Sequence, residues 1–280
     1  HRHIRRGIEL GFYRGHPLVY DGTEPVAIDA QAGKGKFTRF LGVNIVSPRT
    51  AHLTKIITDP KDAELSWSTW KTLEREGYRV RFINPARLHG YPSESYNFNT
   101  RLLEIAARPE LRPLVSDAAY DAASFHVPID PNPAHRWIGQ GVRNAFALYN
   151  EVTALFPSPR WPCTAGGLWD FFGRTPPEIA DDLFVWASDN RMGAQAGMCR
   201  QIAGLTESTN QWNAYSSLII ERLRGYQPET ALRAVTDKNT FDPADMKHER
   251  TALFIIGTAR SDTSRSFVGS MAVATVRARS

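Results

Sequence analysis

The amino-acid sequence predicts an α/β fold that is built on a parallel sheet and interrupted by a long all-helical segment. Residues 25–85 alternate strand, helix, strand, helix and strand, an order typical of a parallel sheet. Residues 100–232 lack convincing strands and carry apolar residues three and four positions apart, as helices do. A further apolar strand, Thr251 to Ile256, follows that segment. We therefore expect the helical segment to be inserted into the α/β domain.

The composition is that of a globular protein. The chain has 280 residues, of which 42% are hydrophobic and 22% charged, which excludes a disordered chain. No apolar run approaches the roughly 18 residues that a membrane span needs. The net charge of +5 permits attraction to nucleic acid or anionic lipid but is equally compatible with an ordinary solvated surface. The two cysteines, Cys163 and Cys199, are too few for a disulfide framework or a metal site, and we expect both to be core residues.

The chain begins with a predicted hairpin and then a candidate phosphate loop. Turn signals at Gly11–Gly15 and Tyr20–Gly22 predict the hairpin. A short apolar strand, Val26–Ile28, leads into the loop Ala30–Lys36 and an apolar-periodic segment beyond it. This layout is typical of a P-loop, whose glycines let phosphate approach and whose backbone N–H groups attract it. Lys36 would reach the terminal phosphates.

The match to the P-loop pattern is incomplete at two positions. Ala30 stands where the pattern has glycine. Phe37 stands where it has the Ser or Thr that holds Mg²⁺, and Thr38 follows one position later. An ordinary basic turn is the alternative interpretation of the loop.

Asp59 follows the second predicted strand, Lys55–Thr58. Ligands of open α/β sheets bind beyond the carboxyl ends of the strands. If this strand and the strand before the loop are neighbours in the sheet, Asp59, Lys61 and Glu64 are expected near the phosphates. Asp59 or Glu64 could then hold Mg²⁺ through water or orient the attacking water. Equally, both acids could start the next helix, because acidic residues suit a helix N-terminus.

The remaining elements are expected in the following order. The polar segment Tyr91–Asn99 is expected to be a loop, and Trp161, Trp169, Trp186 and Trp212 are expected to be core residues rather than base-stacking platforms. The expected strand and helices are the helix Leu65–Glu76 closed by Gly77, the strand Val80–Pro85, and helices at Leu102–Ala106, Ala134–Phe156, Leu168–Phe172, Pro177–Arg191, Ala194–Leu205, Ser208–Arg224 and Ser264–Val276.

Several motifs in this order resemble those of the type IV secretion coupling proteins, the TraG/TraD-type ATPases of conjugation and effector export. They are the loop of form Ala-x-x-Gly-x-Gly-Lys, ITDPKDAEL at Ile57–Leu65, RVRFINP at Arg79–Pro85 and YNFN at Tyr96–Asn99. The stretch Asn210–Met246 is also similar to the family, so the resemblance covers nearly the whole chain.

The resemblance implies a RecA-like P-loop NTPase domain with an inserted all-α subdomain. The expected division is residues 1–99 and 233–280 in the nucleotide-binding domain and residues 100–232 in the all-α domain. The family acts at the cytoplasmic face of the bacterial inner membrane, where N-terminal helices anchor it. Its members form hexamers, work with other type IV secretion components and use ATP to recruit substrate DNA or effector proteins to the channel.

The resemblance also implies ATP and Mg²⁺ as cofactors. Lys36, Asp59 and Glu64 are the expected catalytic residues, and Thr38 and Asp59 the expected Mg²⁺ contacts. The residues expected to contact the nucleotide are Ala32, Gly33, Lys34, Gly35, Lys36, Phe37 and Thr38.

The sequence departs from the family in ways that affect catalysis. Phe37 replaces the usual hydroxyl residue, and Asp62-Ala63 replaces the glycine that usually follows Asp-Pro-Lys. By this resemblance, the family's acidic Walker B strand, sensor glutamine and arginine finger would lie beyond the position of Ser280, and its membrane anchor would also lie outside these residues. The chain is therefore expected to be either part of a longer protein or a truncated relative. We therefore expect this chain alone to hydrolyse ATP poorly. The alternative is a non-catalytic receptor or scaffold that binds secretion partners through its helical segment.

Overall fold

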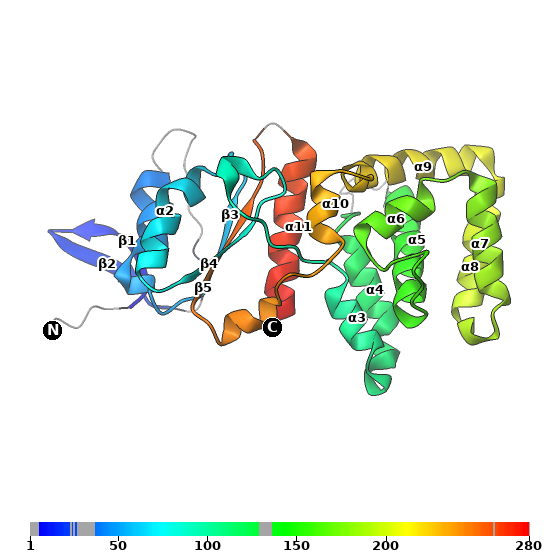
Figure 1. Ribbon diagram of the computed structural model, residues 1–280, viewed down its shortest axis with the longest axis horizontal. Helices are drawn as coiled ribbons and strands as arrows, with labels where there is room; N and C mark the ends of the chain where they lie inside the picture. The colour runs from blue at the N-terminus through cyan, green and yellow to red at the C-terminus, as the bar shows by residue number, and fades with distance from the viewer. Residues whose placement is uncertain are drawn as a thin grey trace. The chain divides into compact units, whose positions relative to one another are not determined.

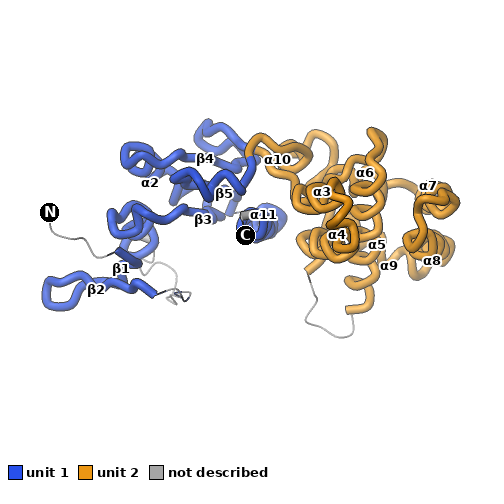
Figure 2. The backbone as a smooth tube through the Cα atoms, turned by 90° about the horizontal axis from the view of Figure 1, so that it is seen from below, with its two compact units in different colours: residues 1–94, 242–280 blue, residues 95–241 orange. Residues whose placement is uncertain are grey.

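The computed structural model of the chain describes residues 6–22, 24, 26, 37–128, 136–259 and 261–279 (Figure 1). The chain divides into two compact units (Figure 2). Unit 1 comprises residues 1–94 and 242–280, and unit 2 comprises residues 95–241. The sequence places the corresponding borders at 99/100 and 232/233, so unit 2 is longer than the predicted helical domain at both ends.

Unit 1 contains a parallel sheet, in agreement with the predicted α/β class. Its strands lie in the order β3 (Lys55–Asp59), β5 (Thr251–Ile256) and β4 (Arg79–Ile83). All six residues of the central strand β5 are buried, which explains its uninterrupted apolar sequence. The strand that the sequence assigns to Val26–Ile28 falls largely outside the described residues, and Val26 itself lies in no strand.

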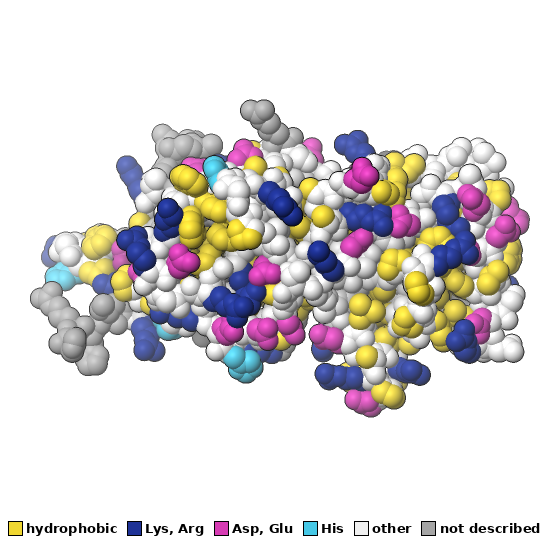
Figure 3. Space-filling view, viewed as in Figure 1, with side chains coloured by type: hydrophobic (Ala, Val, Ile, Leu, Met, Phe, Trp, Pro, Cys, Tyr) yellow, Lys and Arg dark blue, Asp and Glu magenta, His cyan; other side chains and the backbone are white. Residues whose placement is uncertain are grey.

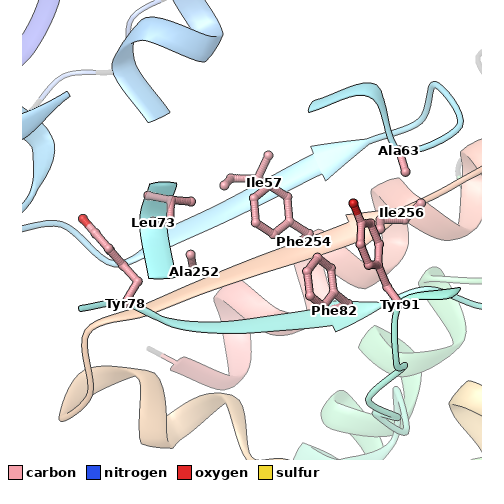
Figure 4. Close-up of a cluster of buried hydrophobic side chains, with 9 residues drawn as sticks. All are labelled: Ile57, Ala63, Leu73, Tyr78, Phe82, Tyr91, Ala252, Phe254 and Ile256. Carbon is pink, nitrogen blue, oxygen red and sulfur yellow. The ribbon is translucent and has the colours of Figure 1, made fainter. Parts of the chain in front are cut away.

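Two helices cover the two faces of this sheet (Figure 1). Helix α2 (Glu64–Arg75) covers the face on which Ile57, Phe82 and Phe254 form an aromatic and aliphatic core (Figure 4). The C-terminal helix α11 (Asp262–Arg279) contacts β3 and β5 from the other face. Because side chains alternate along a strand, β5 supplies both cores. Burial of a side chain such as Phe254 contributes about 1.5–3 kcal/mol.

A hairpin and a short helical segment precede the sheet in unit 1. Strands β1 (Ile8–Tyr13) and β2 (His16–Tyr20) pair antiparallel, which confirms the predicted hairpin. Arg14 and Gly15 form its turn with φ values of 48° and 77°, as a tight two-residue hairpin turn requires. The chain then forms a π-helical turn, η1 (Phe37–Leu41), which continues into α1 (Gly42–Val46) and the 3-10 turn η2 (Pro48–Thr50).

Unit 2 is helical, as the spacing of its apolar residues predicts. Within its described residues, the only β pairing is an isolated bridge between Ser158 and Trp161. The sequence does not single out α4 and α10. The helices are α3 (Thr100–Ala106), α4 (Val115–Ser124), α5 (Arg136–Leu155), α6 (Ala165–Phe172), α7 (Pro176–Ser188), α8 (Gln195–Glu207), α9 (Thr209–Leu223) and α10 (Ala231–Thr236). Short 3-10 turns are η3 (Leu88–Gly90) and η7 (Pro243–Lys247) in unit 1, and η4 (Pro109–Leu114), η5 (Asn190–Met192) and η6 (Arg224–Tyr226) in unit 2.

The core of unit 2 is rich in aromatic side chains. Trp161 and Trp212 are buried, Trp169 and Trp186 are partly buried, and Trp186 stacks on Phe171 at 5.0 Å between ring centroids. The prediction that these tryptophans serve the core is therefore confirmed for Trp161 and Trp212. Cys163 and Cys199 are free and buried, as expected. None of the described helices is long and apolar enough to cross a membrane.

The first and last segments of unit 2 are hydrogen-bonded to each other. Tyr96 N–H donates to the carbonyl of Val235 at 2.9 Å, and Thr240 N–H donates to that of Ser95 at 2.9 Å. Asn97 N–H donates to Asn239 Oδ1 at 2.8 Å. The segment Tyr91–Asn99 has no regular secondary structure, as predicted, yet Tyr96 and most of its neighbours are buried.

Charged side chains of both signs are mixed on the face of the molecule in Figure 3. Lys and Arg are interspersed with Asp and Glu over that face. The interpretation of the net positive charge as an ordinary solvated surface is compatible with this view.

Candidate functional site

The candidate site is the edge at which the three parallel strands of unit 1 end. Strands β3, β4 and β5 end at Asp59, Ile83 and Ile256, so their carboxyl ends share this edge. Open α/β sheets bind their ligands at such an edge, because the loops there can diverge without breaking the sheet. The loops that follow these strands therefore determine what the site can bind.

Asp59 is enclosed at this edge and bound to helix α2. Its side chain is 0% exposed. Oδ2 accepts hydrogen bonds from Ser66 N–H at 2.8 Å and from the Ser66 hydroxyl at 3.0 Å. Ser66 lies in the first turn of α2, where backbone N–H groups lack helical partners and attract negative charge. Asp59 therefore caps α2 from outside the helix, as the helix-start interpretation proposes.

The second oxygen of Asp59 is left without a partner. Oδ1 is buried and accepts no hydrogen bond from any described residue. Burial raises the pKa of the Asp59 carboxyl above its ordinary value, and the nearby donors, Ser66 first and then the backbone N–H groups of Lys61 and Leu65, only partly oppose this. An unpartnered buried oxygen is costly in free energy, so Asp59 Oδ1 is a place where a proton, a water molecule or a ligand would stabilise the fold.

Asp62 connects the loops that follow all three strands. Its N–H donates to the carbonyl of Gly257 at 3.2 Å, and its Oδ1 accepts from Ala259 N–H at 3.2 Å. His89 Nε2 lies 3.3 Å from the Asp62 carbonyl oxygen. Because a carbonyl oxygen only accepts, this contact places a hydrogen on Nε2. The three loops are thus fixed relative to one another.

Left-handed backbone conformations are concentrated in the same loops. Asp62, Ala63, Arg87 and His89 have φ values between 49° and 67°. Residues other than glycine adopt this region at an energetic cost, and such strain persists where the surrounding contacts hold it. The hydrogen bonds of Asp62 are contacts of that kind.

An exposed aromatic pair stands at the edge. Trp67 of α2 is 61% exposed, and its ring lies 4.8 Å from that of His89, measured between centroids. Tyr91 lies beside both rings, and its buried hydroxyl has no hydrogen-bond partner within the described part of the chain. Lys61 and Arg87 are exposed in the adjoining loops. Asp62 and Glu64 are exposed there too, so the edge presents flat aromatic surface together with charges of both signs.

The structure describes only some of the predicted site residues. Residues 30–36, which include Lys36 and most of the predicted nucleotide contacts, lie outside the described residues. Phe37 and Thr38 open the turn η1, and Thr38 is exposed. Asp59 and Glu64 lie at the same edge of the sheet, but Glu64 is exposed whereas Asp59 is buried. The described residues contain no group of three or more His, Cys, Asp or Glu side chains that could hold a metal ion.

Sequence patterns alone do not reveal several residues of this edge. Ser66 could have been predicted as a partner of Asp59, since it occupies the first turn of the expected helix. The contact of Trp67 with His89 joins helix α2 to the 3-10 turn η3, and no local pattern signals it. No protein-family model and no curated protein matches the chain.

Proposed function

We propose that the chain is a nucleotide-binding subunit of a type IV secretion or conjugation coupling ATPase. In this proposal unit 1 is a RecA-like P-loop domain and unit 2 is its inserted all-α domain. The observation that carries the proposal is Asp59, which begins the Asp-Pro-Lys sequence and ends a strand of a parallel sheet at its carboxyl edge. The insertion of an all-helical unit between the two segments of unit 1 supports the same assignment.

Each predicted site residue has a role in this proposal. Residues 32–38 cradle the phosphates of ATP, and Lys36 neutralises their charge. Mg²⁺ is usually held by one or two carboxylates together with the phosphates and water. Glu64 is exposed and can contribute that carboxylate through water, whereas Asp59 is closed against Ser66 and positions α2. Bound Mg²⁺ would offset the negative charge of the phosphates.

The location and partners in this proposal are those that the resemblance to the coupling proteins implies. The subunit would act at the cytoplasmic face of the bacterial inner membrane as one copy of a hexamer. It would recruit DNA or an effector protein to the secretion channel. Charges of both signs are mixed on the face in Figure 3, so that face does not favour DNA over protein as the substrate.

An equilibrium titration with a fluorescent ATP analogue tests nucleotide binding. We expect micromolar affinity in the wild type and loss of binding in Lys36→Ala. Lys71→Ala is the matched control, because it removes an exposed lysine from α2 and should leave the affinity unchanged. Equal binding by wild type and Lys36→Ala would contradict the proposal.

A second titration tests the assignment of Mg²⁺ to Glu64. We expect Glu64→Gln to weaken the Mg²⁺ dependence of ATP binding while leaving Mg²⁺-free binding unchanged. Glu74→Gln removes an exposed acid from the far end of the same helix and serves as the control. An identical response of the two variants to Mg²⁺ would contradict the role of Glu64.

The second candidate function is a non-catalytic receptor or scaffold. The burial of Asp59 and the bonds from Ser66 favour it, because the oxygen that caps α2, Oδ2, is not free to bind a ligand. This candidate predicts no ATP binding by any form of the chain. It also predicts unchanged binding of secretion partners when Lys36 is substituted.

A further inference from the structure

Unit 2 contains a pocket of about 300 Å³ that the proposed nucleotide site does not involve. Its walls come from α4, α5 and the start of α8. The residues that matter for its chemistry are Ser116, Tyr120, Leu148, Glu151, Gln195 and Met198. All residues that line it lie in the described part of the chain, and Glu151 is the only charged one among them.

The Glu151 carboxylate is fixed by neutral donors from two other segments. Its Oε1 accepts a hydrogen bond from the Ser116 hydroxyl at 2.6 Å and one from Gln195 Nε2 at 2.7 Å. No salt bridge to Glu151 occurs among the described residues. Neutral donors orient a carboxylate but leave its negative charge uncompensated. The pocket is therefore complementary to a cation.

The apolar walls suit an aliphatic stem. Leu148 and Met198 line the pocket together with the ring of Tyr120. The Tyr120 hydroxyl accepts hydrogen bonds from Gln140 Nε2 at 2.9 Å and Arg143 Nη1 at 3.2 Å, so the ring is held in place. Long basic side chains bury their methylene groups against such surface while their charged end finds a partner.

Arg143 contacts Tyr120 but forms no salt bridge with Glu151 within the described part of the chain. It is 4% exposed, and its Nε donates to the carbonyl of Val127 at 2.9 Å. Its guanidinium also lies over the Tyr120 ring at 5.4 Å from the centroid. Arg143 is thus held by Val127 and Tyr120, and no salt bridge joins it to Glu151 among the described residues.

We infer that this pocket binds the side chain of a single lysine or arginine of a peptide. The ammonium or guanidinium group would pair with Glu151, and the methylene stem would pack on Leu148, Met198 and Tyr120. A volume of about 300 Å³ lies at the small end of the range for ligand pockets, which suits one side chain better than a whole cofactor. The pocket lies within unit 2, so this inference stands whether or not the chain binds ATP.

Methyl NMR of the full chain with labelled methionine tests the inference. The chain has 4 Met residues, so the spectrum is simple, and Met198→Leu identifies the signal of the pocket. The probes are acetyl-Ala-Lys-Ala-amide, the same peptide with norleucine for lysine, and n-butylammonium. We expect a saturable shift of the Met198 signal with the lysine peptide, no shift with the norleucine peptide, and at least tenfold weaker binding of n-butylammonium.

Two variants separate the pocket from general charge effects. Glu151→Gln keeps an oxygen for Ser116 and Gln195 but removes the charge, and we expect it to weaken lysine-peptide binding at least tenfold. Asp181→Asn removes an exposed carboxylate from α7 and should bind like the wild type. Unmoved signals of the other methionines would show that both variants remain folded.

Three results would overturn the inference. They are a Met198 shift that persists in Glu151→Gln, a shift of equal size with the norleucine peptide, and no shift with any probe. Equal affinity for n-butylammonium and for the lysine peptide would reject a peptide as the occupant and assign the pocket to free amines.

Discussion

Ser66 donates its backbone N–H to Asp59 Oδ2 at 2.8 Å, and both residues are 0% exposed. This bond joins the end of strand β3 to the first turn of helix α2 at the carboxyl edge of the sheet. The carboxylate is therefore part of the structure that holds the edge together. Its Oδ1 is buried and accepts no hydrogen bond from a described residue.

Loss of the Ser66 hydroxyl should destabilise unit 1. Hydrogen bonds to charged groups contribute about 1.5–3 kcal/mol, so we expect Ser66→Ala to lower the free energy of unfolding by about that amount. Urea denaturation measures it. Ser68→Ala is the control, since the Ser68 hydroxyl is exposed and bonds only to backbone carbonyls of its own helix. If Ser66→Ala and Ser68→Ala lowered the free energy of unfolding equally, the Asp59–Ser66 bond would contribute no more to stability than an exposed hydroxyl does.

Asp59→Asn should change how stability depends on pH. Burial raises the pKa of Asp59, so the folded state holds this proton more tightly than the unfolded state does. Wild-type stability should therefore decline as pH rises above 3.8, the ordinary Asp value, up to the folded pKa. The variant has no proton to lose and should lack this decline. The prediction would be contradicted if the unfolding free energies of the wild type and of Asp59→Asn changed equally with pH across this range.

His126 should make unit 2 sensitive to acid. It lies edge-on to the rings of Phe98 and Tyr226, and burial lowers its pKa from 6.5 to about 4. The folded state thus favours the neutral ring. Stability is fully present above pH 6.5 and is lost as pH falls toward 4, by roughly 3 kcal/mol in total.

Urea denaturation between pH 7 and 4 measures the effect of His126. We expect His126→Phe, which keeps an aromatic ring and removes the titration, to lose the acid-dependent part of the decline. His248→Gln changes an exposed histidine and should follow the wild type. A decline in His126→Phe as steep as in the wild type would assign the acid sensitivity to other groups.

Residues 95–241 should fold as an isolated fragment. The ends of unit 2 are hydrogen-bonded to each other through Ser95, Asn97, Asn239 and Thr240. We expect the fragment to unfold cooperatively in urea, as followed by circular dichroism. Asn239→Ala should reduce its stability by about 1–3 kcal/mol, because it leaves the buried N–H of Asn97 without a partner. A fragment without a cooperative transition would show that unit 2 depends on unit 1.

The sequence predicts well those elements whose signal is local. The sequence predicts a strand at Thr251–Ile256, and β5 lies there, because six consecutive apolar or β-branched residues suit a buried strand. The hairpin at the N-terminus likewise follows from its turn residues. The sequence analysis does not single out helix α4, whose buried face consists of Val115 and the small residues Ala119, Ala122 and Ala123.

Features that depend on distant contacts could not be predicted. The sequence does not indicate that β5 lies between β3 and β4. The segment Tyr91–Asn99 is predicted to be a polar loop, but its composition does not indicate that Asn99 is buried, with its amide donating to Asn150 Oδ1 at 3.0 Å. Two interpretations of Asp59 were equally compatible with its position, and only the bond from Ser66 shows that it caps α2.

The central claim is that the loop around Lys36 binds phosphate, and calorimetric titration with ATP, ADP and adenosine in the presence of Mg²⁺ tests it most directly. A phosphate cradle predicts that ATP and ADP bind at least tenfold more tightly than adenosine. It also predicts that Lys36→Ala lowers the affinity for ATP to that for adenosine, while Lys71→Ala does not. Affinities that are the same for ATP and adenosine, or the same in wild type and Lys36→Ala, would contradict the claim.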